Sequence, residues 1–394
     1  MDNNINRVKN CAGCFGCGDV CPKKAISYVQ NEYGFFYPKV DKTKCINCGL
    51  CVKVCPQLNS KIVNQSNQKG FISYSKNNEI YNSSASGGIF SELALYFLNN
   101  NGLVYGASFD GLKVKHIKID KIEDLEKIQR SKYIQSNAKG IYKDCKEYLN
   151  KGKSVLFSGT PCQISALKNY LGKEYDNLLT CDIVCHGVPS QGFFDKCIEL
   201  ENEKRKGKII RFDFRYKTKK HTSPRNFRYI IEKNGKKIER IGNYYDFNYL
   251  VGFYKYLTLR DSCYECKYAK MNRIGDLTLG DYWDVREKYN KENGISMVVV
   301  NTKKGELFLD KIKDKVFLAE ESMQLIKKGN ETFNGPTKMP KERNDFMNLY
   351  TSNFNVAADK YLKVKHKFIL RCYYGMPNFI KTIAKKVIHF NTLK

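Results

Sequence analysis

The sequence predicts an α+β protein: a small cysteine-rich module at the N-terminus, then a larger α/β domain. Eight of the 16 cysteines fall within the first 55 residues. From about residue 71, short apolar runs typical of strands alternate with turns and helical segments. This alternation favours a mostly parallel sheet with functional residues at the strand ends. A basic, aromatic segment closes the chain, and we expect it to be helical toward its end.

Two copies of one cysteine pattern define the N-terminal module. Each copy reads Cys-x2-Cys-x2-Cys-x3-Cys-Pro, and the copies lie 34 residues apart, joined by β-like runs within 25–40. In two-cluster ferredoxins the cysteine before proline ligates the other cluster. Zinc ribbons instead bring cysteines in pairs, so the spacing favours iron–sulfur clusters over zinc. The predicted ligands are Cys11, Cys14, Cys17 and Cys55 for cluster I, and Cys21, Cys45, Cys48 and Cys51 for cluster II.

The elements of the larger domain follow in order behind a polar linker at 59–70. Asn234-Gly235 is a typical turn of a β-hairpin, so we expect a hairpin within 209–242. Strands are expected at 71–74, 103–107, 154–157 and 178–184, with helices from 89 to about 100 and from 162 through 170. The predicted regions are 1–60, 71–330 and a helical extension at 331–394.

Four further cysteines occupy positions suited to a third site. Cys263 and Cys266 can present two sulfurs to one metal, and Cys162 and Cys185 each follow a predicted strand. Strand ends on one edge of a parallel sheet lie near one another, so four cysteine ligands there are geometrically reasonable. For Cys162 two alternatives remain, a reactive thiol with a pKa lowered by a helix N-terminus and a cysteine of the core.

Five motifs in this order carry a resemblance to a known family: Ser84-Ala85-Ser86-Gly87-Gly88, Phe157-Ser158-Gly159-Thr160-Pro161-Cys162-Gln163, Asp182-Ile183-Val184-Cys185-His186-Gly187, Cys263-Tyr264-Glu265-Cys266 and Gly275-Asp276 with Gly280-Asp281. Over roughly 70–330 the chain resembles the coenzyme F420 hydrogenase/dehydrogenase beta-subunit family. Its N-terminal module is similar to that of the longer, dehydrogenase-type members.

The resemblance implies a flavoprotein with FAD and a [4Fe–4S] cluster, relaying electrons to or from a hydride-carrying partner such as coenzyme F420. It implies that Cys162, Cys185, Cys263 and Cys266 ligate a third cluster. The stretch Val184–Gly187 looks like the variant of bacterial relatives, which leaves the hydride partner open.

Candidate flavin contacts follow from the resemblance and from the preference of anions for glycine-rich loops and helix N-termini. An ordinary helix cap or a solvated loop is the alternative for the first two groups. The candidates are Ser84, Ser86, Gly87 and Gly88, then Ser131, Lys132, Tyr133, Gln135 and Ser136, then Gly159, Thr160 and Pro161. Asp276 and Asp281 are expected either to bind ribose, to position the cysteine loop, or to act as turn residues. His186 is a candidate proton donor, with fixing of the Cys185 loop favoured over it.

Composition limits the class of protein. An apolar content of 42% excludes a disordered chain. No run approaches the roughly 18 apolar residues of a spanning helix, and the first nine residues lack an apolar signal segment, so we expect a cytoplasmic protein.

The net charge of +28 favours anionic partners. The basic stretch 211–240 lacks a nucleic-acid-binding motif, so no nucleic-acid partner is expected. The amphipathic stretch 379–390 is expected to pack on the core, with contact to a membrane surface or partner as the alternative.

The sequence thus predicts an iron–sulfur flavoprotein oxidoreductase with a redox partner protein or soluble electron carrier. Two alternatives stay open. One is an electron-transfer subunit without a functional flavin, and the other is a flavin enzyme that reduces a small metabolite.

Overall fold

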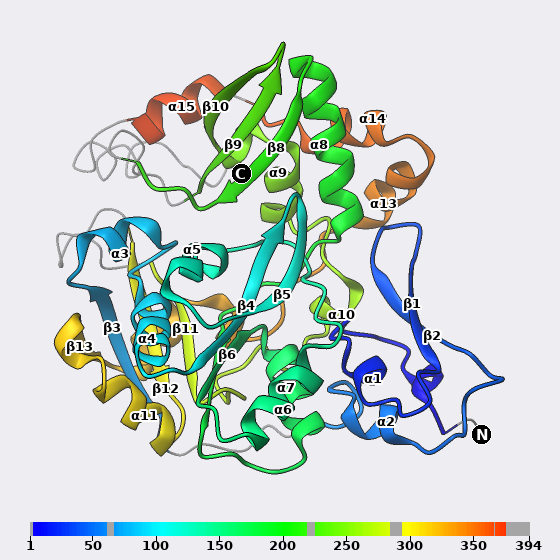
Figure 1. Ribbon diagram of the computed structural model, residues 1–394. Helices are drawn as coiled ribbons and strands as arrows, with labels where there is room; N and C mark the ends of the chain where they lie inside the picture. Colours follow the sequence, from blue (N-terminus) through cyan, green and yellow to red (C-terminus); the bar gives the residue numbers. More distant parts are fainter. Residues whose placement is uncertain (1–2, 61–66, 219–224, 284–293, 366, 376–394) are drawn as a thin grey trace.

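The computed structural model describes residues 3–60, 67–218, 225–283, 294–365 and 367–375 (Figure 1). The N-terminal module consists of two equivalent turn–helix units joined by a hairpin. The units carry α1 (Gly16–Asp19) and α2 (Leu50–Val54), each preceded by a residue in the left-handed conformation, Phe15 and Gly49. Between them, β1 (Ile26–Gln30) pairs antiparallel with β2 (Phe36–Val40). The β-like runs predicted within 25–40 are therefore confirmed, and a 3-10 turn, η1 (Ile5–Arg7), precedes both units.

An eight-stranded sheet forms the centre of the larger domain, in the order β13-β3-β12-β11-β7-β6-β4-β5. Its strands are β3 (Lys69–Ser75), β4 (Leu103–Asp110), β5 (Lys113–Ile119), β6 (Val155–Gly159), β7 (Leu178–Ile183), β11 (Leu277–Tyr282), β12 (Ile295–Val300) and β13 (Val316–Glu321). The α+β class is confirmed. The expectation of a mostly parallel sheet is wrong, because only the central strands β4, β6, β7 and β11 run parallel.

The pair β4–β5 is antiparallel for a local reason. Gly111, with φ of +59°, lies in the short turn between β4 and β5, and a connection that short cannot join parallel strands. On the other side β12 pairs antiparallel with both β11 and β3, and β13 pairs antiparallel with β3. The sheet is therefore mixed.

Helices cover both faces of this sheet. Along β4, Val104 packs into one core with α4 (Ile89–Asn99) and α11 (Lys303–Asp310). Its neighbours Leu103 and Tyr105 pack into the opposite core with α6 (Ile141–Asn150) and α7 (Pro161–Leu171). Side chains alternate between the two cores, as strands buried on both faces require.

A second, three-stranded antiparallel sheet consists of β8 (Lys208–Phe214), β9 (Asn226–Lys233) and β10 (Lys236–Asn243). The predicted turn at Asn234-Gly235 joins β9 to β10, with φ of +49° and +70°. This sheet packs with α8 (Gln191–Arg205), α9 (Asn248–Tyr254) and α13 (Arg343–Ser352) around a core rich in phenylalanine and tyrosine. Figure 1 shows it as a separate layer beyond the end of the large sheet.

Shorter helices complete the described chain. They are α3 (Asn78–Ser83), α5 (Leu125–Ile128), α10 (Asp261–Tyr264), α12 (Met323–Lys328), α14 (Phe354–Ala357) and α15 (Lys367–Gly375), with the turns η2 (Ile122–Asp124), η3 (Tyr244–Asp246), η4 (Lys313–Lys315), η5 (Glu331–Phe333) and η6 (Ala358–Leu362). The amphipathic stretch predicted at 379–390 lies outside the described residues. Within the described ranges, none of the helices has the length and apolar character needed to traverse a bilayer.

The N-terminal module lies against α6 and α7 (Figure 1). The Asp19 carboxylate accepts hydrogen bonds from the backbone N–H of Gly140, at 2.7 Å, and of Tyr142, at 3.1 Å. The amide of Asn169 in α7 donates to the carbonyl of Val54 at 3.3 Å. These contacts bring the cysteine module to the edge of the sheet where β6 and β7 end.

Candidate iron–sulfur and flavin site

The predicted cluster I cysteines converge in the interior. Cys14, Cys17 and Cys55 are buried and Cys11 is half-buried. Burial raises the pKa of Cys14 well above the usual value, and the nearby thiols of Cys17, Cys55 and Cys11 raise it further. Burial also raises the pKa of Cys17 to about 12. Cys55 thus lies near the cysteines of the first motif, as the crossed grouping requires, while the ligation itself stays a prediction.

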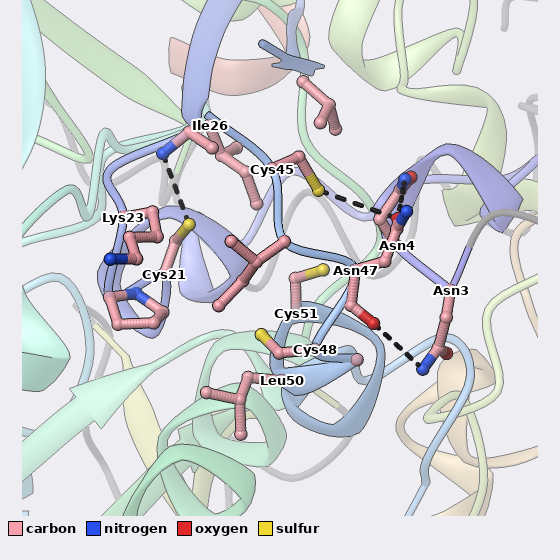
Figure 2. Close-up of a pocket in the computed structure, with 15 residues that line it drawn as sticks. Asn3, Asn4, Cys21, Lys23, Ile26, Cys45, Asn47, Cys48, Leu50 and Cys51 are labelled. Atoms are coloured by element: carbon pink, nitrogen blue, oxygen red, sulfur yellow. Dashed lines mark hydrogen bonds between the residues drawn. The ribbon is translucent and has the colours of Figure 1, made fainter. Parts of the chain in front are cut away.

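The predicted cluster II cysteines line a cavity of about 370 Å³ nearer the surface. Figure 2 shows Cys21, Cys45, Cys48 and Cys51 around this space, with Lys23 beside Cys21. Cys48 is exposed, whereas Cys51 is buried. Cys21 accepts a hydrogen bond from the backbone N–H of Ala25 at 3.3 Å. Cluster II would therefore be the more accessible of the two.

A second cavity, of about 600 Å³, opens between the module and the large domain and is lined by four further cysteines. Cys162 is in the first turn of α7, Cys185 lies just past β7, and Cys263 and Cys266 flank the end of α10. Because β6 and β7 are parallel neighbours, their ends bring Cys162 and Cys185 to one edge. Ala12 and Gln57, from the two cysteine motifs of the module, form part of the same wall.

The environment of Cys162 does not favour a reactive thiolate. The hydroxyl of Thr160 lies 3.1 Å from its sulfur. Burial nevertheless raises the pKa of Cys162 to about 11 and that of Cys263 to about 12. The lowering expected from a helix N-terminus is therefore outweighed by desolvation, and the reactive-thiol alternative is not supported.

His186 lies on the wall of the same cavity. Its backbone carbonyl accepts a hydrogen bond from the Thr337 hydroxyl at 2.7 Å, which fixes the loop that carries Cys185. Burial lowers the pKa of the His186 imidazole. A contact that fixes the loop is thus present, while the role of proton donor stays a prediction.

The loop 84–88 forms hydrogen bonds with other residues of the large domain. The Ser86 hydroxyl donates to the carbonyl of Ile295 at 2.9 Å, and the Gly87 N–H donates to the Ser296 hydroxyl at 2.9 Å. The Ser84 hydroxyl lies 3.1 Å from that of Ser91. Gly88 begins α4 with φ of +92°, a conformation that favours glycine. These bonds use the hydroxyl groups that were expected to reach a phosphate.

The stretch 131–136 divides between two roles. The ammonium group of the partly buried Lys132 donates to the carbonyl of Gln129, and desolvation lowers its pKa to about 7. The Tyr133 ring stacks on Phe253 with centroids 4.7 Å apart. Gln135 instead donates to the carbonyls of Ala12 and Gly13, at 2.9 and 3.2 Å, and so holds the N-terminal module.

The remaining candidates of these groups serve the local structure. Ser136 is buried between the side chains of His116 and Gln163, whereas Ser131 is half-buried at the start of the stretch. Gly159 ends β6 and lies against the Gln163 side chain. Thr160 and Gln163 form a capping box at the start of α7, and Pro161 occupies its first position. Pro161 and Thr160 also line the cysteine cavity.

Asp276 acts within the fold. One carboxylate oxygen accepts from the Thr180 N–H at 2.9 Å and the Thr180 hydroxyl at 2.6 Å, and the other accepts from the Thr302 hydroxyl at 2.8 Å. It joins β7, β11 and α11, in line with the turn alternative, and both oxygens are engaged there. Asp182 also acts within the fold, where it forms a buried ion pair with Arg273 at 2.8 Å.

The sequence did not single out Arg215, which has the densest set of contacts near the loop 84–88. Its buried guanidinium binds both carboxylate oxygens of Asp281, at 2.7 and 2.9 Å, and donates to the carbonyl of Ala85 at 3.0 Å. It also donates to the Tyr133 hydroxyl at 3.1 Å. Lys217 donates to the carbonyls of Tyr81 and Ser86 at 2.7 and 2.6 Å. In the sequence both residues are indistinguishable from the other basic residues of 211–240.

Three groups of four cysteines, two in a ferredoxin-like repeat and one at the end of parallel strands, define an iron–sulfur protein of the oxidoreductase class. Comparison with family models agrees with this. Residues 152–325 match the model for the C-terminal part of the coenzyme F420 hydrogenase/dehydrogenase beta subunit. Residues 10–59 and 37–88 match models described as "4Fe-4S dicluster domain". Over residues 152–325 the chain thus resembles the coenzyme F420 hydrogenase/dehydrogenase beta subunit, and it carries an N-terminal 4Fe–4S dicluster domain.

Three curated relatives each match a short segment of this chain. An uncharacterized ferredoxin of Methanocaldococcus jannaschii is 40% identical over 52 residues, 13% of this chain and 65% of the ferredoxin. The ketoisovalerate oxidoreductase subunit VorC of Methanothermobacter marburgensis is 38% identical over 58 residues, 14% of this chain and 72% of that subunit. The match to one subunit of an ion-translocating oxidoreductase complex of Methanosarcina acetivorans, 40% identical over 47 residues, covers 12% of this chain and only 16% of that protein.

A solved structure of the F420-reducing [NiFe] hydrogenase complex from Methanosarcina barkeri contains a similar chain. The similarity covers 75% of this chain and 97% of that one, with 16% identity and a TM-score of 0.46.

Proposed function

We propose that this protein is an iron–sulfur flavoprotein that relays electrons between three [4Fe–4S] clusters and FAD, and exchanges hydride with a deazaflavin-like or other soluble carrier. The observation that carries the proposal is the cavity lined by Cys162, Cys185, Cys263 and Cys266. It lies against the cluster I motif, because Ala12 and Gln57 share its wall. Electrons leaving the N-terminal module would therefore enter the large domain there.

The donor set suits a polynuclear cluster. The four cysteines line one cavity, and four thiolates around one space are what an inorganic iron–sulfur core requires.

Burial supports one order of the clusters. The exposed Cys48 belongs to the cluster II set, whereas the cluster I set lies inside, with Cys14 in the same core as Tyr268 and the partly buried Cys162 and Cys266. We infer a path from cluster II through cluster I to the third cluster and then to FAD. A redox partner protein or carrier would exchange electrons at the cluster II surface. Electron flow in either direction would use the same path.

Cationic groups near the loop 84–88 support a flavin nucleotide. When bound, FAD couples single-electron transfer to two-electron hydride chemistry. Its pyrophosphate is an anion, and the Nε–H groups of Arg130 and Arg215 are both buried without a hydrogen-bond partner among the residues described. Arg215 and Lys217 would hold the loop 84–88, while Lys132 and Arg130 add positive charge nearby.

The alternative, an electron-transfer subunit without flavin, is favoured by one observation. The hydroxyl groups of Ser84 and Ser86 and the N–H of Gly87 are already bonded within the protein. In that case the third cluster would be the end of the path inside this chain, and a partner would perform the hydride chemistry.

Iron and flavin analysis of anaerobically reconstituted protein tests the proposal. We expect about 12 iron atoms per chain, with flavin absorption at roughly 370 and 450 nm. The double variant C263S/C266S should hold about 8 iron atoms and retain the N-terminal clusters. Cys145→Ser, which removes a buried thiol of α6, is the matched control and should keep the wild-type iron content.

The possible results separate the hypotheses. About 8 iron atoms in the wild type would overturn the third cluster. Full iron content without flavin bands, even after incubation with FAD, would support the electron-transfer subunit instead. Zinc in place of iron would overturn both.

A further inference from the structure

Arg260 is a fully buried arginine at the junction of the N-terminal module and the large domain, with 0% of its surface exposed. Its Nε–H donates to the carbonyl of Cys11 at 2.6 Å, and one Nη donates to the carbonyl of Phe36 at 2.9 Å. The other Nη donates to the Gln135 amide oxygen at 2.9 Å. The guanidinium also lies 4.2 Å from the centre of the Tyr37 ring. One side chain thus binds both the first cysteine motif and the β1–β2 hairpin.

The backbone of Arg260 forms hydrogen bonds with two segments that contain cysteines of the third group. Arg260 is the residue before α10, and its carbonyl accepts a hydrogen bond from the N–H of Cys263 at 2.9 Å. Its own N–H donates to the carbonyl of Val188, in the segment that follows Cys185, at 3.0 Å. The same residue therefore contacts the backbone of Cys11, a predicted cluster I ligand, through its side chain, and through its own backbone it contacts two segments that carry predicted ligands of the third site.

In the described part of the chain, the guanidinium of Arg260 is surrounded by neutral groups. Among the residues that the structure describes, no Asp or Glu oxygen lies within 4.0 Å of its guanidinium. The adjacent Asp261 is paired with Arg343 instead. Burying an arginine without an anionic partner is costly, since carbonyl oxygens and an aromatic face neutralise none of its charge. The other buried arginines of the site, Arg215 and Arg273, each have an aspartate.

We propose that Arg260 is a positioning residue whose counter-charge is supplied by the iron–sulfur clusters on its two sides, so that it raises their reduction potentials and fixes their relative placement. This rests on the proposed function, because it requires cluster I and the third cluster. A [4Fe–4S] core with four thiolates carries a net negative charge, which grows by one on reduction. A fixed cation in a medium of low dielectric stabilises the reduced form more than the oxidised form.

A redox titration of the reconstituted full-length protein, followed by EPR of the reduced clusters, tests this. In Arg260→Met we expect the equilibrium constant for reduction of cluster I and the third cluster to fall at least tenfold, a shift of about 59 mV to more negative potential for each one-electron couple. Arg260→Lys keeps the charge and should retain most of the potential, although it loses the forked hydrogen bonds. The signal of cluster II should not move in either variant.

Lys53→Met is the matched control. It removes one positive charge from an exposed position of the same module, between Cys51 and Cys55. Because water and salt screen exposed charges, it should leave the potentials of cluster I and the third cluster unchanged. A shift as large as that of Arg260→Met would overturn the proposal.

Other results are equally decisive. Unchanged potentials in Arg260→Met, with full iron content, would overturn the role of Arg260 and leave the relay itself standing. If Arg260→Met assembles no clusters, loading of Arg260→Lys but not Arg260→Gln supports the role of the charge, and failure of all three shows a purely structural role. If the wild type holds only about 8 iron atoms, the third cluster is absent. The reduction potential of cluster I alone then tests the role of Arg260.

Discussion

His116 illustrates how one buried side chain links several segments behind the cysteine cavity. Its Nδ1 accepts from the Ser136 hydroxyl at 2.8 Å, and its Nε2–H donates to the carbonyl of Ser158 at 3.0 Å. Ser136 in turn accepts a hydrogen bond from Gln163, one residue after Cys162. Burial lowers the pKa of His116 from 6.5 to about 4, so the imidazole is neutral in the fold.

We therefore expect His116 to make the protein sensitive to acid. Between its folded pKa of about 4 and its unfolded value of 6.5, the unfolded chain binds a proton that the folded chain does not. The contribution to stability is thus complete above 6.5 and is lost as the pH falls. From pH 7.5 to pH 5.0 the loss should be roughly 2 kcal/mol. Denaturant unfolding of wild type and His116→Gln across this range measures it.

The difference between the two proteins is the informative quantity, because carboxylates titrate in both. His116→Gln should be destabilised at pH 7.5 and lose less additional stability than the wild type at pH 5.0. Parallel pH profiles for the two proteins would contradict the assignment.

A functional residue can be predicted from the sequence when its role requires a fixed spacing to its neighbours in the sequence. The eight N-terminal cysteines could be assigned to a dicluster module because a short spacing around a compact core leaves a signature, and their crossed ligation stays a prediction. Arg215 and Arg260 could not be predicted, because each has contacts from segments more than 60 residues away in the sequence, such as Arg215 with Asp281 and Arg260 with Cys11. A single arginine in a basic chain gives no local signal of burial.

At the scale of elements, the tip of the β1–β2 hairpin meets the start of α8 through two glycines. Gly34 has φ of +77°, and a Cβ on it would lie 2.6 Å from the Cα of Gly192. A Cβ on Gly192 would lie 2.8 Å from the Cα of Gly34. The Ser190 hydroxyl donates to the carbonyl of Tyr33 at 2.6 Å beside this contact. Backbone therefore packs on backbone where the N-terminal module meets α8.

We expect Gly192→Ala to loosen the hairpin tip. Alanine is favoured over glycine inside a helix by about 1 kcal/mol, but the added methyl would press on the backbone of Gly34, and such overpacking costs roughly 1–3 kcal/mol. Hydrogen exchange at residues 31–36 should become faster. Gly329→Ala, at the end of α12 with its nearest contact at 3.5 Å, is the control and should change nothing. Unaltered exchange in Gly192→Ala would show that the tip can move aside without cost.

The elements of the large domain were mostly predictable, and their arrangement was not. Apolar runs with glycine turns placed β4, β6, β7 and α7 close to their observed bounds. The same runs do not reveal the direction of a neighbouring strand, since a strand buried on both faces is apolar in a parallel or an antiparallel pair. This is why the sheet was expected to be mostly parallel and is instead mixed.

At the scale of the whole molecule, the excess of 68 Lys and Arg over 40 Asp and Glu and the exposed Cys48 both bear on the redox partner. Lys23 and Lys24, next to Cys21 of the cluster II set, and Lys53 in α2 are exposed. The apolar side chains of Ile46 and Leu50, on either side of Cys48, are exposed as well. An apolar centre with a positive rim suits an acidic carrier protein.

We expect electron exchange with an acidic ferredoxin to slow as ionic strength rises, because salt screens the attraction. The double variant K23E/K24E should lower the rate at low salt by roughly tenfold. K236E/K237E makes the same charge change at the exposed start of β10 and should have little effect. Stopped-flow measurement of both variants tests whether the carrier approaches cluster II. Equal slowing by both would indicate a general effect of net charge.

The exchange of one cysteine between the two repeated motifs has a consequence for how the module tolerates damage. Cys21 belongs with the second motif and Cys55 with the first, so on the proposed ligation each iron core cross-links both halves of the module. Oxygen that destroys the outer core would free Cys21 but leave Cys55 tethering the second half. Repair could then begin from a scaffold already folded on the inner core, rather than from an open chain.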